Sequence, residues 1–189
     1  QPPAEGVMAL VRDHDISADQ VAQIKVETFH EAKRLNAIPT NTEQAQYSLP
    51  FATAAALLRG TIGVPEITQD GLSDPAIMEM ARRVEISETE PFNAAFPARR
   101  FARVHLHLKD GRVLSSKDTE AQGDPENKVA DAVIWSKFRN LTNPVLGQGW
   151  SNSFLARARA LPDAAQTHEL LDLLLTKTVD TAAQRHLGQ

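Results

Sequence analysis

The chain contains no cysteine among its 189 residues. This excludes disulfides, thiolate nucleophiles and cysteine-ligated zinc, which are common ways to stabilise or equip a small domain. Because a chain without cysteine needs no oxidising compartment, the absence favours a cytoplasmic location. At this length a chain buries roughly 70% of its unfolded surface, so a hydrophobic core can hold it together without cross-links.

Long apolar runs and an excess of positive charge are also lacking. No window reaches the ~20 apolar residues of a membrane span, which predicts no transmembrane helix and no membrane partner. The net charge of −4 argues against a nucleic-acid partner, because nucleic-acid binders present a positive field. The sequence starts with Gln1 and runs at once into an apolar segment, so we expect a piece of a longer protein.

Familiar catalytic motifs are missing as well. The sequence has no nucleophile elbow, GxGxxG, Walker loop or HExxH pair. His105 and His107 are two residues apart on a predicted strand, so they point to one side and could form a metal pair. The neighbouring Arg103 and Lys109 instead favour a solvated sheet face, or a basic strip for an anionic substrate or a neighbouring domain. We therefore predict no metal and no cofactor.

What the sequence does contain is clear periodicity. Alternation over Val21–Phe29 predicts a strand with one buried face, and Phe101–Leu108 with Arg112–Ser116 predicts a hairpin around a Lys-Asp-Gly turn. Val84–Ser87 predicts a further short strand. Apolar spacing and cap residues predict helices over 3–12, 50–59, 128–141, 152–161 and 167–175, and one more that begins at residue 75. We expect the helix over 167–175 to continue or fray beyond residue 175. Proline and glycine density predicts loops over 63–71 and 88–100.

These elements predict an α+β fold. We expect a small antiparallel sheet of about three or four strands with helices packed on one face, plus C-terminal helices.

The stretch from Gln46 to Gly60 joins a polar junction to a tightly packed helix. Pro50 suits the first turn of a helix and Gly60 its end, while the alanines between them let a neighbouring element approach closely. Tyr47 lies at the junction, where it is either a core aromatic whose hydroxyl needs a partner or a ligand-facing residue.

Several segments, in their order, resemble the C-terminal half of the MmgE/PrpD family. They lie within about residues 4–175 and are 46–52, 55–60, 72–77, the turn 109–111, and 123–127 leading to 137–139. The resemblance implies a lyase that uses neither a metal nor a cofactor. We expect a hydro-lyase that dehydrates a small polycarboxylate such as 2-methylcitrate. The resemblance also implies a homodimer. An epimerase, isomerase or decarboxylase of the same family is the alternative.

The resemblance also implies which part of the family's architecture is present. Residues 1–145 would be the smaller α+β lid domain, and residues 146–189 would be C-terminal helices that pack on a helical domain absent from this chain. The family's main acid–base residues belong mostly to that domain or to the segment just before Gln1. The chain alone is therefore expected to be an inactive lid or dimerisation module.

By the same resemblance, the connector after the first strand and the junction at 46–48 face the active-site cleft. Proton removal beside a carboxylate needs cations and a base tuned near neutrality. We therefore predict catalytic roles for His30, Lys33 and Tyr47, and substrate binding by Arg34, Gln46 and Ser48. For His30, the alternative is a histidine at the end of a strand that bonds only to nearby groups. For Lys33 and Arg34, the alternative is a solvated turn of helix. The decarboxylases' tyrosine would fall near Lys33 or Arg34, where this chain has none, which favours dehydration.

Overall fold

The protein consists of two compact units in the computed structural model, which describes residues 1–125 and 127–175. The first unit spans Gln1–Asn127 and holds the whole sheet, and the second begins at Lys128 and is helical where it is described. The predicted α+β class is confirmed.

The order of elements in the first unit places most helices between the first two strands. The elements are α1 (Pro2–His14), η1 (Ala18–Gln20), β1 (Val21–Thr28), α2 (His30–Lys33), α3 (Thr42–Gln46), α4 (Leu49–Arg59), α5 (Val64–Ile67), α6 (Gln69–Leu72), α7 (Pro75–Ala81), β2 (Val84–Glu88), α8 (Glu90–Ala95), β3 (Arg103–Leu108) and β4 (Val113–Ser115). The second unit contributes α9 (Asp131–Ala160), η2 (Leu161–Asp163) and α10 (His168–Leu175).

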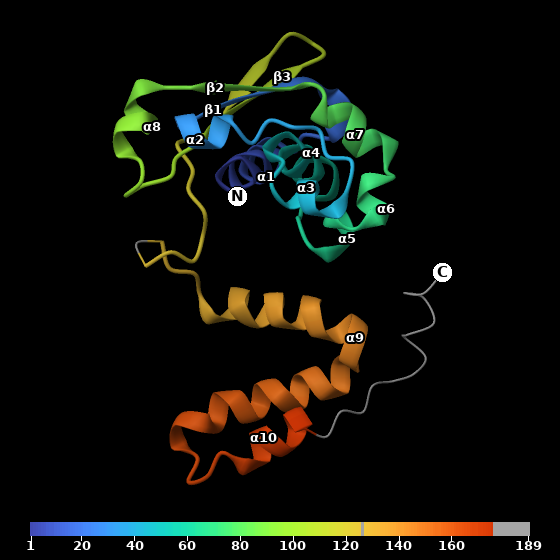
Figure 1. Ribbon diagram of the computed structural model, residues 1–189, viewed down its shortest axis with the longest axis vertical. Helices are drawn as coiled ribbons and strands as arrows, with labels where there is room; N and C mark the ends of the chain where they lie inside the picture. Colours follow the sequence, from blue (N-terminus) through green and yellow to red (C-terminus); the bar gives the residue numbers. More distant parts are fainter. Residues whose placement is uncertain (126, 176–189) are drawn as a thin grey trace. The chain divides into compact units, whose positions relative to one another are not determined.

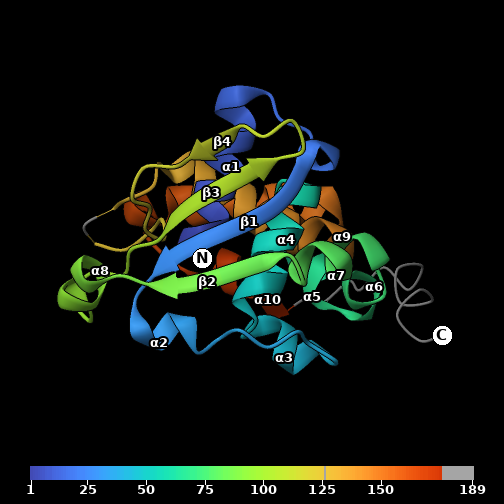
Figure 2. The same cartoon turned by 90° about the horizontal axis from the view of Figure 1, so that it is seen from above.

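The sheet is mixed, with the strand order β2-β1-β3-β4 (Figure 2). β3 pairs antiparallel with β1 and with β4, as the predicted hairpin requires, but β1 and β2 run parallel. The prediction of an antiparallel sheet is wrong at this pair. The chain between β1 and β2 forms a helical crossover, and such a crossover returns the chain to the starting end of the first strand.

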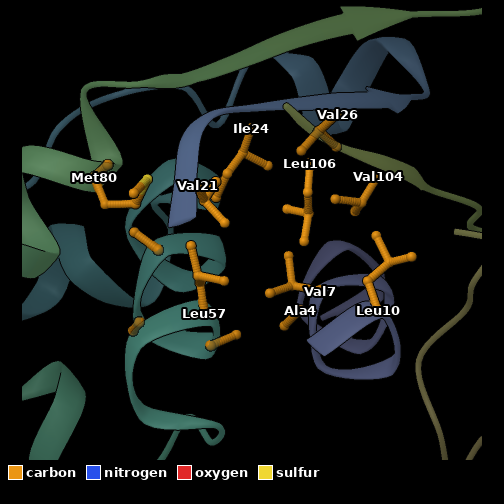
Figure 3. Close-up of a cluster of buried hydrophobic side chains, with 14 of the residues drawn as sticks. Ala4, Val7, Leu10, Val21, Ile24, Val26, Leu57, Met80, Val104 and Leu106 are labelled. Atoms are coloured by element: carbon orange, nitrogen blue, oxygen red, sulfur yellow. The ribbon is translucent and has the colours of Figure 1, made fainter. Parts of the chain in front are cut away.

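Helices cover one face of the sheet, as predicted. Figure 1 shows α1 and α4 side by side beneath the strands, and Figure 3 shows Ile24, Val26 and Leu106 pointing from the sheet toward them. Val7 from α1 and Leu57 from α4 meet these side chains in the same buried cluster. Removal of this apolar surface from water is the main force that holds the first unit together.

Local cap chemistry sets the limits of α4. The Oγ of Ser48 accepts a hydrogen bond from the backbone N–H of Phe51 at 3.2 Å, and Pro50 occupies the first turn. Gly60 ends the helix in the left-handed conformation, with φ of 68°. The predicted helix is confirmed, and it begins one residue earlier, at Leu49.

Three predicted irregular stretches contain short helices instead. The loop predicted over 63–71 holds α5 and α6, the loop predicted over 88–100 holds α8, and the connector after β1 forms the single turn α2. Pro65 and Pro91 sit in the first turns of α5 and α8. Proline is favourable in the first turn of a helix. A proline in the sequence can therefore indicate the start of a helix as well as a loop.

The second unit joins two of the predicted helices into α9. Gly147, with φ of 80° and ψ of 154°, interrupts the helical conformation inside it, which accounts for the predicted separation of 128–141 from 152–161. Phe138, Trp150 and Phe154 stack across this kink. The predicted continuation beyond 175 lies outside the described residues. In the part of the chain that is described, no helix is both long and apolar enough to cross a membrane.

Phe51 tests the core of the first unit, because its side chain is 1% exposed. Phe51→Ala should lower the free energy of unfolding by about 3–5 kcal/mol through lost burial and a residual cavity. Urea unfolding followed by circular dichroism measures the loss. The exposed Val64 provides the control, and Val64→Ala should change stability by less than ~0.5 kcal/mol. Both tryptophans lie in the second unit, so their fluorescence should report an unchanged second unit.

Candidate functional site

The first unit contains a pocket of about 190 Å³ where segments distant in sequence meet. Its walls come from the first turn of α1, the end of β1, α2, and the junction between α3 and α4. Apolar side chains predominate in the walls, among them Phe29, Ala32, Leu35, Leu49 and Ala52. We call this cavity the α2–α4 pocket. It suits the carbon skeleton of a small ligand, because such sites are concave and mostly apolar with few polar groups.

Four residues that line this pocket have polar side chains and are exposed to solvent. They are Gln1, Gln46, Tyr47 and Arg100. Tyr47 is 66% exposed, so its interpretation as a core aromatic is wrong. Among the described residues, no hydrogen bond or ion pair engages the Arg100 guanidinium, and this permanent cation is therefore available to an anionic group.

The backbone of the first turn of α4 contributes little to anion binding. The N–H of Leu49 donates to the carbonyl of Leu35 at 2.9 Å, and the N–H of Phe51 donates to Ser48. Ser48 itself is 2% exposed, and its hydroxyl donates to the carbonyl of Ala37 at 2.6 Å. Ser48 lines the pocket but its hydrogen-bonding groups are used within the chain, which leaves Arg100 as the pocket's cation.

A second polar group lies where the two parallel strands end. Glu88, the last residue of β2, places one carboxylate oxygen 2.9 Å from Nδ1 of His30 and the other 2.9 Å from Nζ of Lys33. The side-chain amide of Asn93 donates to Glu88 at 3.4 Å, and its oxygen accepts from the backbone N–H of His30 at 2.7 Å. These four residues form the Glu88 cluster. Hydrogen bonds from Lys33 and then His30 lower the pKa of Glu88 to about 2.

The single turn of α2 separates these two groups of residues. Phe29, Ala32 and Leu35 line the α2–α4 pocket, whereas His30 and Lys33 bond to Glu88. The structure thus brings Gln46, Tyr47 and Ser48 together at the pocket and places His30 and Lys33 in the Glu88 cluster. The remaining predicted site residue, Arg34, is exposed and belongs to neither group. The predicted roles of all six residues stay predictions.

Three polar residues of these groups, Glu88, Asn93 and Arg100, were not foreseen from the sequence. Glu88 was assigned to a loop, and an antiparallel sheet would have put the end of β2 far from the end of β1. Arg100 was assigned to the same loop, although the charged pair Arg99–Arg100 directly precedes the strand that pairs with β1. Arg99 forms an ion pair with Glu120, so only the second arginine lines the α2–α4 pocket.

The histidine pair on β3 belongs to the polar face of the sheet. Nδ1 of His105 lies 2.7 Å from the Oγ of Ser115, and its Nε2 lies 3.7 Å from a carboxylate oxygen of Glu27. In the ranges that the structure describes, no three histidine or acidic side chains gather as metal ligands.

The fold and the pocket define an α+β domain that offers a small ligand an apolar wall with a cationic rim. The chain belongs to the MmgE/PrpD family, whose C-terminal domain matches residues 1–161. This match confirms the resemblance noted in the sequence. A cis-aconitate decarboxylase from Mus musculus is 22% identical over 147 residues, which cover 78% of this chain. The chain spans only 30% of that relative's length.

The Glu88 cluster should make stability depend on pH. Because the folded-state pKa of about 2 lies below the ordinary value of 4.5, the stabilisation is present above about pH 4.5 and is lost as the pH falls through about 2. Glu88→Gln should destabilise the first unit at pH 7, and its difference from the wild type should shrink on acidification. Urea midpoints between pH 7 and about pH 2.5 measure this, with exposed Glu31→Gln as control. A constant difference across this range would contradict the ionic origin.

Proposed function

We propose that this chain is the C-terminal lid-type domain of a lyase that dehydrates a small polycarboxylate such as 2-methylcitrate. The observation that carries the proposal is that exposed Tyr47 and Arg100 both line one apolar pocket in a domain of this family. Arg100 would bind a substrate carboxylate, and the apolar walls of the pocket would hold part of the carbon skeleton. Gln46 would add a hydrogen bond from its side-chain amide.

Dehydration of a hydroxy acid breaks a C–H bond and a C–O bond and forms a carbon–carbon double bond. A base takes the proton beside a carboxylate, and the hydroxyl leaves as water after an acid protonates it. Tyr47 would serve as that acid or as a hydrogen-bond donor to the developing charge. His30 and Lys33 would keep their proposed catalytic roles by contacting substrate carboxylates across the exposed side of α2. Arg34, on the same turn, would then bind a second carboxylate.

A second reaction is supported by the comparison with a named relative. The similarity to a cis-aconitate decarboxylase makes decarboxylation the main alternative, and an epimerase or isomerase would use the same proton abstraction. All of these reactions act on small polycarboxylates, for which one guanidinium at the rim of an apolar pocket is a suitable anchor.

The remaining 70% of such an enzyme would supply the other wall of the site. We propose a helical domain as the partner of the second unit, whose exposed apolar side chains include Val133, Ile134, Leu141, Val145, Leu171, Leu174 and Leu175. Large exposed apolar side chains that gather on one unit mark a contact with another protein surface. We also propose that the assembled protein is a cytoplasmic homodimer, and that this chain alone is inactive.

Substitutions at the pocket test the proposed substrate anchor. In a full-length family protein that contains this chain, Arg100→Ala should raise KM for 2-methylcitrate by about tenfold or more, because a charge-assisted hydrogen bond is lost. Tyr47→Phe should lower kcat by roughly 10²-fold if the hydroxyl acts as the acid. The absorbance of the unsaturated product, with 2-methylcitrate, citrate and cis-aconitate as substrates, measures both values.

Arg112→Ala is the matched control, since Arg112 lies at the β3–β4 turn and pairs with Asp110. It should leave both parameters unchanged. Unchanged kinetics in both pocket variants would remove Tyr47 and Arg100 from the site. Turnover by the 189-residue chain alone would contradict the assignment of the main acid–base groups to another domain.

The apolar surface of the second unit generates a separate prediction. In the same full-length protein, replacement of Leu171 and Leu174 by glutamate should uncouple thermal unfolding into two transitions, because it buries charge at the proposed domain contact. Differential scanning calorimetry measures the number of transitions. The surface control replaces two exposed charged residues, Arg157 and Glu169, by glutamine. A single unfolding transition in the variant with both leucines replaced would rule out this domain contact.

A further inference from the structure

The single turn α2 forms part of the α2–α4 pocket, although it is too short to be stable by itself. It contains four residues, His30–Lys33, and isolated helices shorter than ~12–15 residues are marginal in water. Its place in the fold must therefore come from contacts with the elements around it. Phe29 and Ala32, which line the pocket, can keep their positions only while these contacts hold.

Two sets of contacts hold this turn. Phe29 stacks on Phe96 with ring centroids 4.7 Å apart, and Ala32 packs with Phe92 in a small apolar cluster. The opposite side of the turn is held by the Glu88 cluster, in which one carboxylate bonds to both His30 and Lys33. The first set holds Phe29 and Ala32, and the Glu88 cluster holds His30 together with Lys33, the last residue of α2.

The end of α2 is connected directly to the pocket's polar junction. The N–H of Leu35 donates to the carbonyl of Ala32 at 3.0 Å, and the carbonyl of Leu35 accepts from the N–H of Leu49 at 2.9 Å. Leu49 is the first residue of α4, two positions after Tyr47. Figure 2 shows α2 and α8 at the arrowhead ends of β1 and β2. Glu88 is the last residue of β2. A displacement of α2 therefore reaches Tyr47 through Leu35 and Leu49.

We propose that Glu88 is a positioning residue for the α2–α4 pocket. Its carboxylate holds the exposed side of α2 through His30 and Lys33, and this contact keeps both the apolar wall and Tyr47 in the arrangement that binds a carboxylate ligand. The inference rests on the proposed function only for the nature of that ligand. Glu88 itself does not line the pocket, so it acts through other residues.

Amide hydrogen exchange on the 189-residue chain tests the positioning role without any ligand. Glu88→Ala should speed exchange at the amides of Lys33, Leu35 and Leu49 by roughly fivefold, as expected for an exposed ion-pair network. The amides that pair β1 with β3 should speed by a smaller factor, set by the fall in the global stability of the first unit. Glu85→Gln is the matched control, because Glu85 lies on the same strand and pairs with Lys25 instead.

A merely global loss of stability would speed exchange at the β1–β3 amides by the same factor as at Lys33, Leu35 and Leu49, and that result overturns the proposal. Unchanged exchange at all three α2 and α4 amides also overturns it, since the Phe29–Phe96 stack would then hold the turn alone. Glu88→Gln keeps the shape of the side chain and replaces the alanine variant if that variant does not fold. The same outcomes apply to it.

Ligand binding adds a second readout. Tyr47 is the only tyrosine, so 3-fluorotyrosine labelling gives a single ¹⁹F resonance at the pocket. Citrate should shift this resonance in the wild type, and Glu88→Ala should raise the citrate Kd about fivefold, whereas Glu85→Gln should not. An equal Kd in the wild type and the alanine variant overturns the proposal. If citrate and 2-methylcitrate shift nothing even in the wild type, the proposed function fails, and hydrogen exchange alone decides the role of Glu88.

Discussion

The parallel pairing of β1 with β2 is the constraint on which the candidate site depends. The register sets Ile24 opposite Val84 and Thr28 opposite Glu88, so both strands end at the same edge of the sheet. The backbone N–H of Thr89 donates to the carbonyl of Thr28 at 3.0 Å and continues this pairing past the strands. As a result, the helical turns that follow the two strands start side by side, and their polar side chains meet.

The same pairing explains why α2 can have two different sides. On one side, its apolar residues join the wall of the α2–α4 pocket, and on the other side His30 and Lys33 reach the carboxylate of Glu88. An exposed ion pair contributes little free energy by itself. Three donors on one carboxylate, combined with the stacked Phe29 and Phe96, hold a turn that has almost no stability of its own. In the proposed positioning role of Glu88, these small local energies maintain the shape of the α2–α4 pocket.

The pocket also shows how a domain of this family can present a partial site. Its exposed polar side chains are few, and its walls are supplied mainly by residues near 1–4, 28–35 and 46–53. One cation, Arg100, supplies the positive charge, because the first-turn amides of α4 bond within the chain. In the proposed function, Arg100 binds one carboxylate of the substrate, and the main acid–base groups belong to another domain.

Local patterns in the sequence were sufficient for α4, β1 and the β3–β4 hairpin. Pro50 and Gly60 delimit α4 because each has a backbone preference that acts within one turn, and alternation marks β1 because strand geometry has a period of two. The short helices α5, α6 and α8 were missed because four to six residues carry no readable period. The exposed Tyr47 could not be distinguished from a core aromatic, since its neighbours in sequence are both polar and apolar.

The sequence by itself determined the α+β class, the family resemblance and the membership of Gln46, Tyr47 and Ser48 in one junction, because these depend on neighbours along the chain. Only the tertiary structure decided that β2 runs parallel to β1, that His30 and Lys33 bind Glu88, and that Arg100 reaches the pocket. Those contacts join residues more than 50 positions apart. They follow from the crossover of the chain and the burial of the sheet, which no local pattern encodes.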